Sequence, residues 1–131
     1  MEPREVLGRY RQAMLDKSPD DLAELYADDG VHEFPFRFPG VPKRLEGREA
    51  VRAGYRTMWD AMPVRATSIR EVAVHETTDP QVIIAEQVVL AGPEGAEPGE
   101  VPGLLVIRVR EGRIVHVRDY LDNSAAAALT H

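Results

Sequence analysis

The feature that most restricts the fold of this chain is a pair of strand-like runs near the C-terminal end of the sequence. Residues 103–110 and 113–121 are rich in valine, isoleucine and leucine, and only Glu111 and Gly112 separate them. Branched apolar residues favour strands, and a two-residue connection that ends in glycine suits a tight turn. We therefore expect the two runs to pair as an antiparallel hairpin.

Two further strands are predicted before this hairpin. Residues 64–76 partly alternate between apolar and polar side chains, and residues 81–91 are rich in valine and isoleucine. The sequence Thr77-Thr78-Asp79-Pro80 has the composition of a turn, whereas residues 92–102 contain glycine and proline and predict a loop. The second half of the chain is thus predicted to be four antiparallel strands.

The first half has helical patterns instead. An apolar stripe at helical spacing predicts a first helix; its members are Val6, Leu7, Tyr10, Ala13 and Met14. Ser18-Pro19-Asp20-Asp21 has the composition of a helix start, because serine caps, proline fits the first turn and acids favour the positive end of the helix dipole. We expect this second helix to bury Leu22, Leu25 and Tyr26 and to end at Asp28-Asp29-Gly30.

A short strand and a third helix complete the first half. Residues 31–36 are predicted to be a strand in which Pro35 limits pairing, and residues 37–46 a loop. The third helix is expected from about Gly47 to the residues before Pro63, with Tyr55 and Trp59 on its apolar face. Helices segregated from an antiparallel sheet define an α+β fold, and 131 residues suit one domain over residues 1–131.

Composition excludes several functions. The net charge of −6 argues against nucleic-acid binding, which needs clustered lysine and arginine. Without cysteine there is no disulfide, thiolate zinc site or cysteine nucleophile. No apolar run has the roughly 18 residues of a membrane span, and the first residues do not resemble a signal peptide. We expect a cytoplasmic protein with no membrane contact, and no cofactor, since phosphate loops and dinucleotide motifs are absent.

Four strings resemble the nuclear transport factor 2-like superfamily, and in particular its SnoaL-like branch, also known as ketosteroid isomerase-like. The strings are His32-Glu33-Phe34-Pro35-Phe36, Leu45-Glu46-Gly47-Arg48-Glu49-Ala50-Val51, Gly112-Arg113-Ile114-Val115 and Arg118-Asp119-Tyr120-Leu121-Asp122. The resemblance implies a cone-shaped half-barrel: three N-terminal helices packed on a curved, mainly antiparallel sheet around a small-molecule pocket. It also implies a homodimer formed through the sheet. Members include cyclases, isomerases, dehydratases and binding modules, so the fold alone does not give the function.

Asp119 is the first catalytic candidate. If Arg110 pairs with Arg113, regular alternation places Arg108 opposite Val115 and Asp119 on the face that points into the pocket. A carboxylate in an apolar pocket can serve as an acid or a base near neutral pH. The position of Asp119 also resembles the acidic residue on the final strand of SnoaL-like cyclases. The alternatives are a solvated Asp119, or one paired with Arg118.

The same regular pairing places another row on the outer face. That row is apolar enough to suggest the dimer interface; its members are Ile107, Val109, Ile114, His116 and Tyr120.

His32 is the second catalytic candidate, because histidine exchanges protons near neutral pH. His32 and Glu33 are neighbours on a strand, so only one of them can face the pocket, and Glu33 is a candidate for ligand binding. The alternative is that His32 lies at the surface and Glu33 forms a hydrogen bond locally or with Arg48. The spacing of the histidines does not suggest a metal site. Glu86 is a further candidate for ligand binding, because it interrupts an apolar strand. The alternative is a structural ion pair of Glu86 with Arg70 or Arg108.

Aromatic residues are the remaining candidates for ligand binding. Tyr10, Tyr26, Tyr55 and Trp59 can line a pocket or simply pack in the core, and Phe34 is expected near the pocket mouth. The leading hypothesis is a cofactor-independent acid–base enzyme of the polyketide cyclase or isomerase type, acting on a small apolar ligand that carries a carbonyl group. The alternative is a non-catalytic module for ligand binding or dimerisation.

Overall fold

The structure is a computed structural model and describes residues 1–129. The first half contains α1 (Pro3–Asp16), α2 (Pro19–Ala23), β1 (Tyr26–Glu33), β2 (Arg44–Glu46) and α3 (Arg48–Ala61). The second half contains β3 (Val64–Glu76), β4 (Val82–Pro93), β5 (Gly99–Arg110), β6 (Arg113–Leu121) and α4 (Asn123–Ala128). These elements confirm the α+β class.

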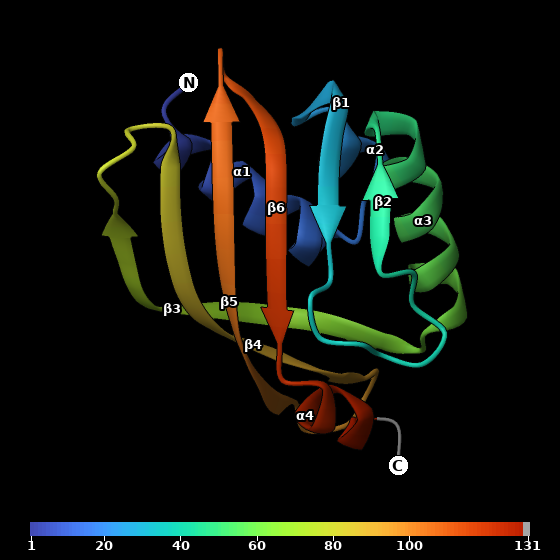
Figure 1. The fold of residues 1–131 in the computed structure, drawn as a ribbon. Coiled ribbons are helices and arrows are strands. Elements are labelled where there is room, and N and C mark those ends of the chain that lie inside the picture. Colours follow the sequence, from blue (N-terminus) through green and yellow to red (C-terminus); the bar gives the residue numbers. More distant parts are fainter. Residues whose placement is uncertain (130–131) are drawn as a thin grey trace.

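The strands form one six-stranded sheet in the order β2-β1-β6-β5-β4-β3. Neighbouring strands are antiparallel except β1 and β6, which are parallel. β3 and β4 bend strongly, so the sheet curves around the side on which α1 lies (Figure 1). Buried side chains of α1 and α3 pack on this side against inward-facing residues of the sheet.

The extents of the elements in the first half differ from the prediction. A strand was expected between the second and third helices, but β1 begins at Tyr26 rather than at Val31, and β2 lies in the segment predicted to be a loop. Helix α2 ends at Ala23 rather than near Gly30. Tyr26, predicted on a helix, begins β1 and pairs with Ile114 of β6. The backbone N–H of Ile114 donates to the carbonyl of Leu25 at 2.8 Å, so pairing with a distant strand overrides the local helical pattern. Pro35 lies beyond β1.

A bulge in β6 changes which residues face the helices. Arg110 pairs with Arg113 and Val109 with Ile114, but Arg108 pairs with His116, so the register skips Val115. One extra residue on one strand reverses the alternation beyond it. The predicted pairing of Arg108 with Val115 is therefore wrong.

The predicted outer row is wrong for the same reason. Ile107 and Ile114 are fully buried in the core and Val109 is 4 % exposed, so these residues cannot form a dimer surface. Beyond the bulge, His116 and Tyr120 do lie on the outer face of β6, since Val117 and Asp119 face inward.

In residues 1–129, no helix is long and apolar enough to cross a membrane.

Candidate active site

A cavity of about 230 Å³ lies between the sheet and helices α1 and α3. Strands β3 to β6 supply one wall, and the segment 34–41 and α4 supply further lining residues. Most lining side chains are apolar or aromatic; among them are Met14, Phe34, Phe36, Met58, Trp59, Ile69, Val89, Val101, Leu105 and Leu121. An apolar wall with a few polar groups is the usual make-up of a small-molecule site.

Three polar side chains of the cavity wall belong to one hydrogen-bonding and electrostatic cluster: Tyr10 of α1, Tyr55 of α3 and Asp119 of β6. Asp119 is the one carboxylate among the described lining residues, and 14 % of its side chain is exposed. It faces inward because the bulge at Val115 puts Val117, Asp119 and Leu121 on the helix-covered side. The prediction that Asp119 lies on the pocket side is confirmed, although the predicted register is not.

His32 lies behind this wall and contacts both Tyr55 and Asp119 of the cluster. It is fully buried, and it belongs to β1 directly beside β6. Its Nδ1 atom lies 2.7 Å from the Tyr26 hydroxyl, and its Nε2 atom lies 3.1 Å from the Tyr55 hydroxyl and 3.2 Å from Asp119 Oδ2. Both ring nitrogens therefore have partners, which fixes the orientation of the imidazole.

The chemistry of the partners assigns the protons on a neutral His32. An ionised Asp119 can only accept, so Nε2–H donates to Asp119 Oδ2. Nδ1 is then free to accept the hydrogen bond from the Tyr26 hydroxyl. The phenol, imidazole and carboxylate form a continuous chain from the core to the cavity, in which His32 orients Asp119 and does not itself line the cavity.

Burial raises the pKa of the Tyr10, Tyr26 and Tyr55 hydroxyls well above the ordinary value for tyrosine. The nearby Asp119 carboxylate acts in the same direction on all three pKa values, because a second negative charge would be repelled. These phenols therefore remain neutral hydrogen-bond donors. The buried Tyr10 hydroxyl lies in the electrostatic range of Tyr55 and Asp119, but no partner in residues 1–129 satisfies it with good geometry.

The structure divides the predicted site residues into two groups. Asp119, Tyr55, Trp59 and Phe34 line the cavity, whereas His32 and Tyr26 support it from behind. Trp59 packs edge-on against Tyr55, with ring centroids 4.9 Å apart.

Glu33 and Glu86 do not line this cavity. Glu33 pairs with His116 and with Arg44 at 3.2 Å, which agrees with the expectation that only one of His32 and Glu33 points inward. Glu86 pairs with His75 at 2.5 Å instead of with Arg70 or Arg108, and 42 % of its side chain is exposed. In residues 1–129, no group of three or more His, Cys, Asp or Glu side chains could hold a metal ion.

Gln87 and Lys17 are polar lining residues for which no role was predicted from the sequence. Gln87 could have been singled out from the sequence as a candidate, because it is an amide inside the apolar run of β4. Lys17 ends α1 in a left-handed conformation, and its ammonium donates to the carbonyls of Met62 and Val64, both at 3.0 Å. Only the tertiary fold brings Lys17 to the cavity, so no local pattern could have identified it.

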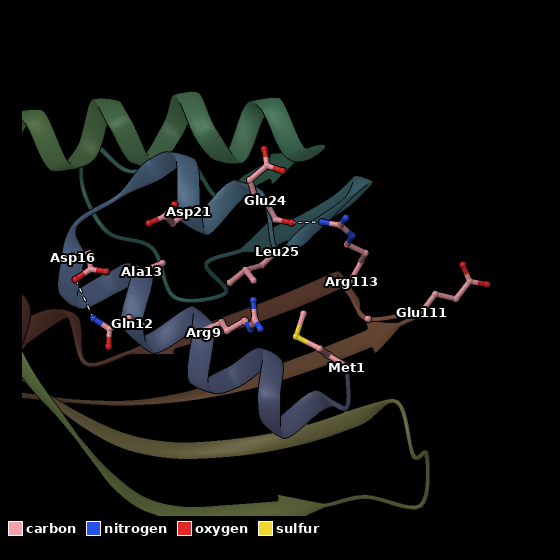
Figure 2. Close-up of a pocket in the computed structure, with 11 residues that line it drawn as sticks. Met1, Arg9, Gln12, Ala13, Asp16, Asp21, Glu24, Leu25, Glu111 and Arg113 are labelled. Carbon is pink, nitrogen blue, oxygen red and sulfur yellow. Dashed lines mark hydrogen bonds between the residues drawn. The ribbon is translucent and has the colours of Figure 1, made fainter.

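A second hollow, of about 610 Å³, lies beside α1 and the β5–β6 turn. Its lining residues, drawn in Figure 2, are mainly charged: Arg9, Arg113, Asp16, Asp21, Glu24 and Glu111. Arg113 donates to the carbonyl of Glu24, and Gln12 donates to Asp16 at 2.9 Å. This hollow has neither the aromatic walls nor the buried cluster of the first cavity.

The fold and cavity define the class as a curved α+β sheet protein with an internal apolar cavity. Comparison with known proteins gives the family. Residues 7–117 match the family model of the SnoaL-like domain, so the chain belongs to the SnoaL-like family. It is 33 % identical over 122 residues to YesE, an uncharacterised protein of Bacillus subtilis (strain 168), covering 88 % of this chain and 78 % of YesE. It is 30 % identical over 125 residues to the uncharacterised PhzA/B-like protein PA3332 of Pseudomonas aeruginosa, covering 92 % and 84 %.

Solved structures confirm the ketosteroid isomerase-like fold. A candidate isomerase from Bacillus subtilis superposes with a TM-score of 0.83 at 29 % identity, covering 97 % of this chain and 91 % of that one. RV0760c of Mycobacterium tuberculosis, solved with estradiol-17β-hemisuccinate, superposes with a TM-score of 0.75 at 22 % identity, covering 95 % and 98 %.

Proposed function

We propose that this protein is a cofactor-independent acid–base enzyme of the isomerase or polyketide cyclase type. The observation that carries the proposal is Asp119, a single carboxylate in an apolar cavity, oriented by the buried His32 and next to neutral tyrosine hydroxyls. Catalytic acids and bases are typically found in such surroundings. The similarity to a candidate isomerase agrees with this assignment.

The proposed reaction begins with a proton transfer to Asp119. The carboxylate removes a proton from the carbon next to a ligand carbonyl, and the C–H electron pair moves to the carbonyl oxygen to give an enolate. The hydroxyls of Tyr10 and Tyr55 donate hydrogen bonds to that oxygen, where the negative charge develops. In a ligand with a C=C bond conjugated with this enolate, protonated Asp119 returns its proton to the far carbon of that bond, which moves the double bond. In a ligand with a second carbonyl, the enolate carbon attacks that carbonyl and closes a ring, and Asp119 returns its proton to the alkoxide that forms.

The cavity favours a ligand smaller than a steroid. Its volume of about 230 Å³ is below the roughly 300–1,000 Å³ of sites for drug-sized ligands. RV0760c shows that the same fold can hold a steroid derivative, but that similarity concerns the fold alone. We therefore expect a ligand of about two fused rings, apolar apart from its oxygen groups.

The proposal can be tested without knowing the natural substrate. 2-Tetralone is a two-ring ketone with exchangeable protons next to its carbonyl, and NMR in heavy water follows their replacement by deuterium. The wild-type protein is expected to accelerate this exchange. Binding of 2-tetralone without any acceleration would favour the alternative function, a non-catalytic ligand-binding module.

A homodimer through the outer face of the sheet is part of the same proposal. Side chains alternate between the two faces of a strand, so Ile84, Val106 and Tyr120 lie on the outer face, and Arg118 lies opposite Val106 there. Equilibrium sedimentation of wild type and Val106→Glu tests it: a dimer that Val106→Glu dissociates is expected. The cytoplasmic location stays a prediction.

A further inference from the structure

Gln87 is a buried polar residue of the cavity that the proposed reaction does not use. It lies in the middle of β4, is 8 % exposed and lines the cavity. Its Oε1 atom accepts a hydrogen bond from Arg11 Nε at 2.9 Å. Burying an amide among valine and isoleucine side chains is unfavourable unless its polar atoms have partners.

The hydrogen bond from Arg11 fixes which end of the amide is which. A guanidinium has only donors, so the atom that faces Arg11 must be the oxygen of Gln87. The Nε2 group, with two N–H donors, is therefore the other end of the side chain. In residues 1–129, the hydrogen bond from Arg11 is the one found for the Gln87 side chain, and the Nε2 atom of Gln87 is not among the fully buried atoms that lack a partner.

Arg11 is itself held in place. Its Nη1 atom lies 2.8 Å from Glu71 Oε1, and Glu71 Oε2 also accepts from Arg4 at 3.1 Å. The side chain of Arg11 is only 15 % exposed, so it has little freedom to move away from Gln87. A surface ion pair thus orients an amide inside the cavity.

The register places Gln87 well away from Asp119. Asp119 pairs with Leu105 and Leu105 with Ala85, so Gln87 is two strands from Asp119 and two residues further along β4. With strands about 4.8 Å apart and a rise of about 3.3 Å per residue, the two backbones are roughly 12 Å apart. Gln87 and Asp119 are therefore polar groups at two separated places of the cavity wall, with apolar lining residues such as Leu105 between them.

We propose that Gln87 Nε2 is a second anchoring point, which donates a hydrogen bond to an oxygen of the ligand. The inference rests on the proposed function of the cavity and narrows its substrate class. The ligand carries two oxygen groups at opposite ends of an apolar body: one at Asp119, Tyr10 and Tyr55, and a carbonyl or ether oxygen at Gln87. If Gln87 only supports Arg11, its free donors bind water and the second oxygen is irrelevant.

A pair of probes separates these two readings. 6-Acetyl-2-naphthol has a hydroxyl at one end and a carbonyl acceptor at the other, and 6-isopropyl-2-naphthol has the same shape without the acceptor. The dissociation constants of both probes are measured by calorimetry, and their ratio is compared between variants. A substitution that changes the apolar contacts of both probes equally leaves this ratio of dissociation constants unchanged.

Gln87→Leu is expected to shift the ratio about five-fold against the acetyl probe, the effect of one neutral hydrogen bond. Arg11→Met keeps the amide but frees its orientation, so a smaller shift in the same direction is expected. Gln12→Leu, at an exposed glutamine of α1, is the control and should leave the ratio unchanged.

The outcomes distinguish this inference from the proposed function. If Gln87→Leu binds both probes with the same ratio of dissociation constants as the wild type, the role of Gln87 is overturned and the role of Asp119 stays intact. Failure of the wild-type protein to bind either probe contradicts both, because the cavity would then not accept a two-ring ligand. Circular dichroism of each variant confirms that the fold is retained.

Discussion

The Nε2 atom of His32 lies 3.2 Å from Oδ2 of Asp119, although 87 positions separate the two residues in the sequence. Parallel pairing of β1 with β6 places His32 beside Val117, two residues before Asp119 on the same face. Asp119 reaches the cavity while His32 stays fully buried, so the imidazole orients the carboxylate and, in the proposed function, the carboxylate is the group that would contact a ligand.

Replacing His32 by leucine should disturb the orientation of Asp119 without weakening the binding of 2-tetralone. His32→Leu leaves the buried Tyr26 hydroxyl without its partner, which costs about 1–3 kcal/mol of unfolding free energy in urea titrations. The rate of deuterium exchange into 2-tetralone should fall, while its dissociation constant should change little because the imidazole does not line the cavity.

Tyr26→Phe provides the matched control for that loss of stability. The double variant Tyr26→Phe/His32→Leu removes both partners, so its loss of stability should be smaller than the sum of the two single losses. Additive losses would contradict a direct interaction between the phenol and the imidazole.

The three buried tyrosines predict a sharp loss of stability in alkali. Their pKa values are raised in the folded protein, so above about pH 10 the unfolded chain loses protons that the folded chain keeps. The contribution of the tyrosines to the free energy of unfolding is therefore fully present below that pH. It falls as the pH rises, by about 1.4 kcal/mol per pH unit for each tyrosine. Urea unfolding at increasing pH measures the slope.

Single Tyr→Phe variants identify the residues responsible for this slope. Each of Tyr10→Phe, Tyr26→Phe and Tyr55→Phe should reduce the slope of unfolding free energy against pH by the contribution of one tyrosine. In the wild type, the tyrosinate absorbance of these residues should appear together with unfolding. Tyrosinate absorbance of the buried residues before unfolding would contradict their desolvation.

Much of the fold followed from local pattern, whereas the site did not. Residues 64–76 and 113–121 were predicted as strands and form β3 and β6 with those limits, because their composition and bounding turns act locally. The inward direction of Asp119 was predicted, but from a hairpin register that the bulge at Val115 alters. The partnership of His32 with Asp119 depends on the β1–β6 pairing, which no local pattern in the sequence encodes.

The bulge itself is testable by deleting single residues of β6. Removing Val115 restores regular alternation and still leaves Val117 and Asp119 facing inward, so the variant should fold and catalyse exchange. Removing Arg118 instead turns Asp119 outward relative to Val117, so activity should be lost.

The two deletions are compared by circular dichroism and by the exchange assay. Equal activity of both deletions would contradict the role assigned to the bulge.

Trp59 makes ligand binding visible, because it is the one tryptophan of the chain and lines the cavity against Tyr55. Binding of 2-tetralone should change the intensity or wavelength of its fluorescence in a saturable manner. Ala91→Phe fills part of the cavity from β4 and should weaken this response, whereas Ala61→Phe, at the exposed end of α3, should not. An unchanged response in Ala91→Phe would place the ligand elsewhere.

The most direct test of the account is the exchange rate of 2-tetralone with Asp119→Asn, a substitution of nearly equal shape that removes the base. If Asp119 takes the proton, the exchange rate of the bound ketone falls about 10²–10⁴-fold while the Trp59 fluorescence titration still shows binding. Asp16→Asn, on the exposed surface of α1, serves as the control and keeps the wild-type rate. An Asp119→Asn protein that exchanges as fast as the wild type would contradict the assignment of Asp119 as the catalytic base.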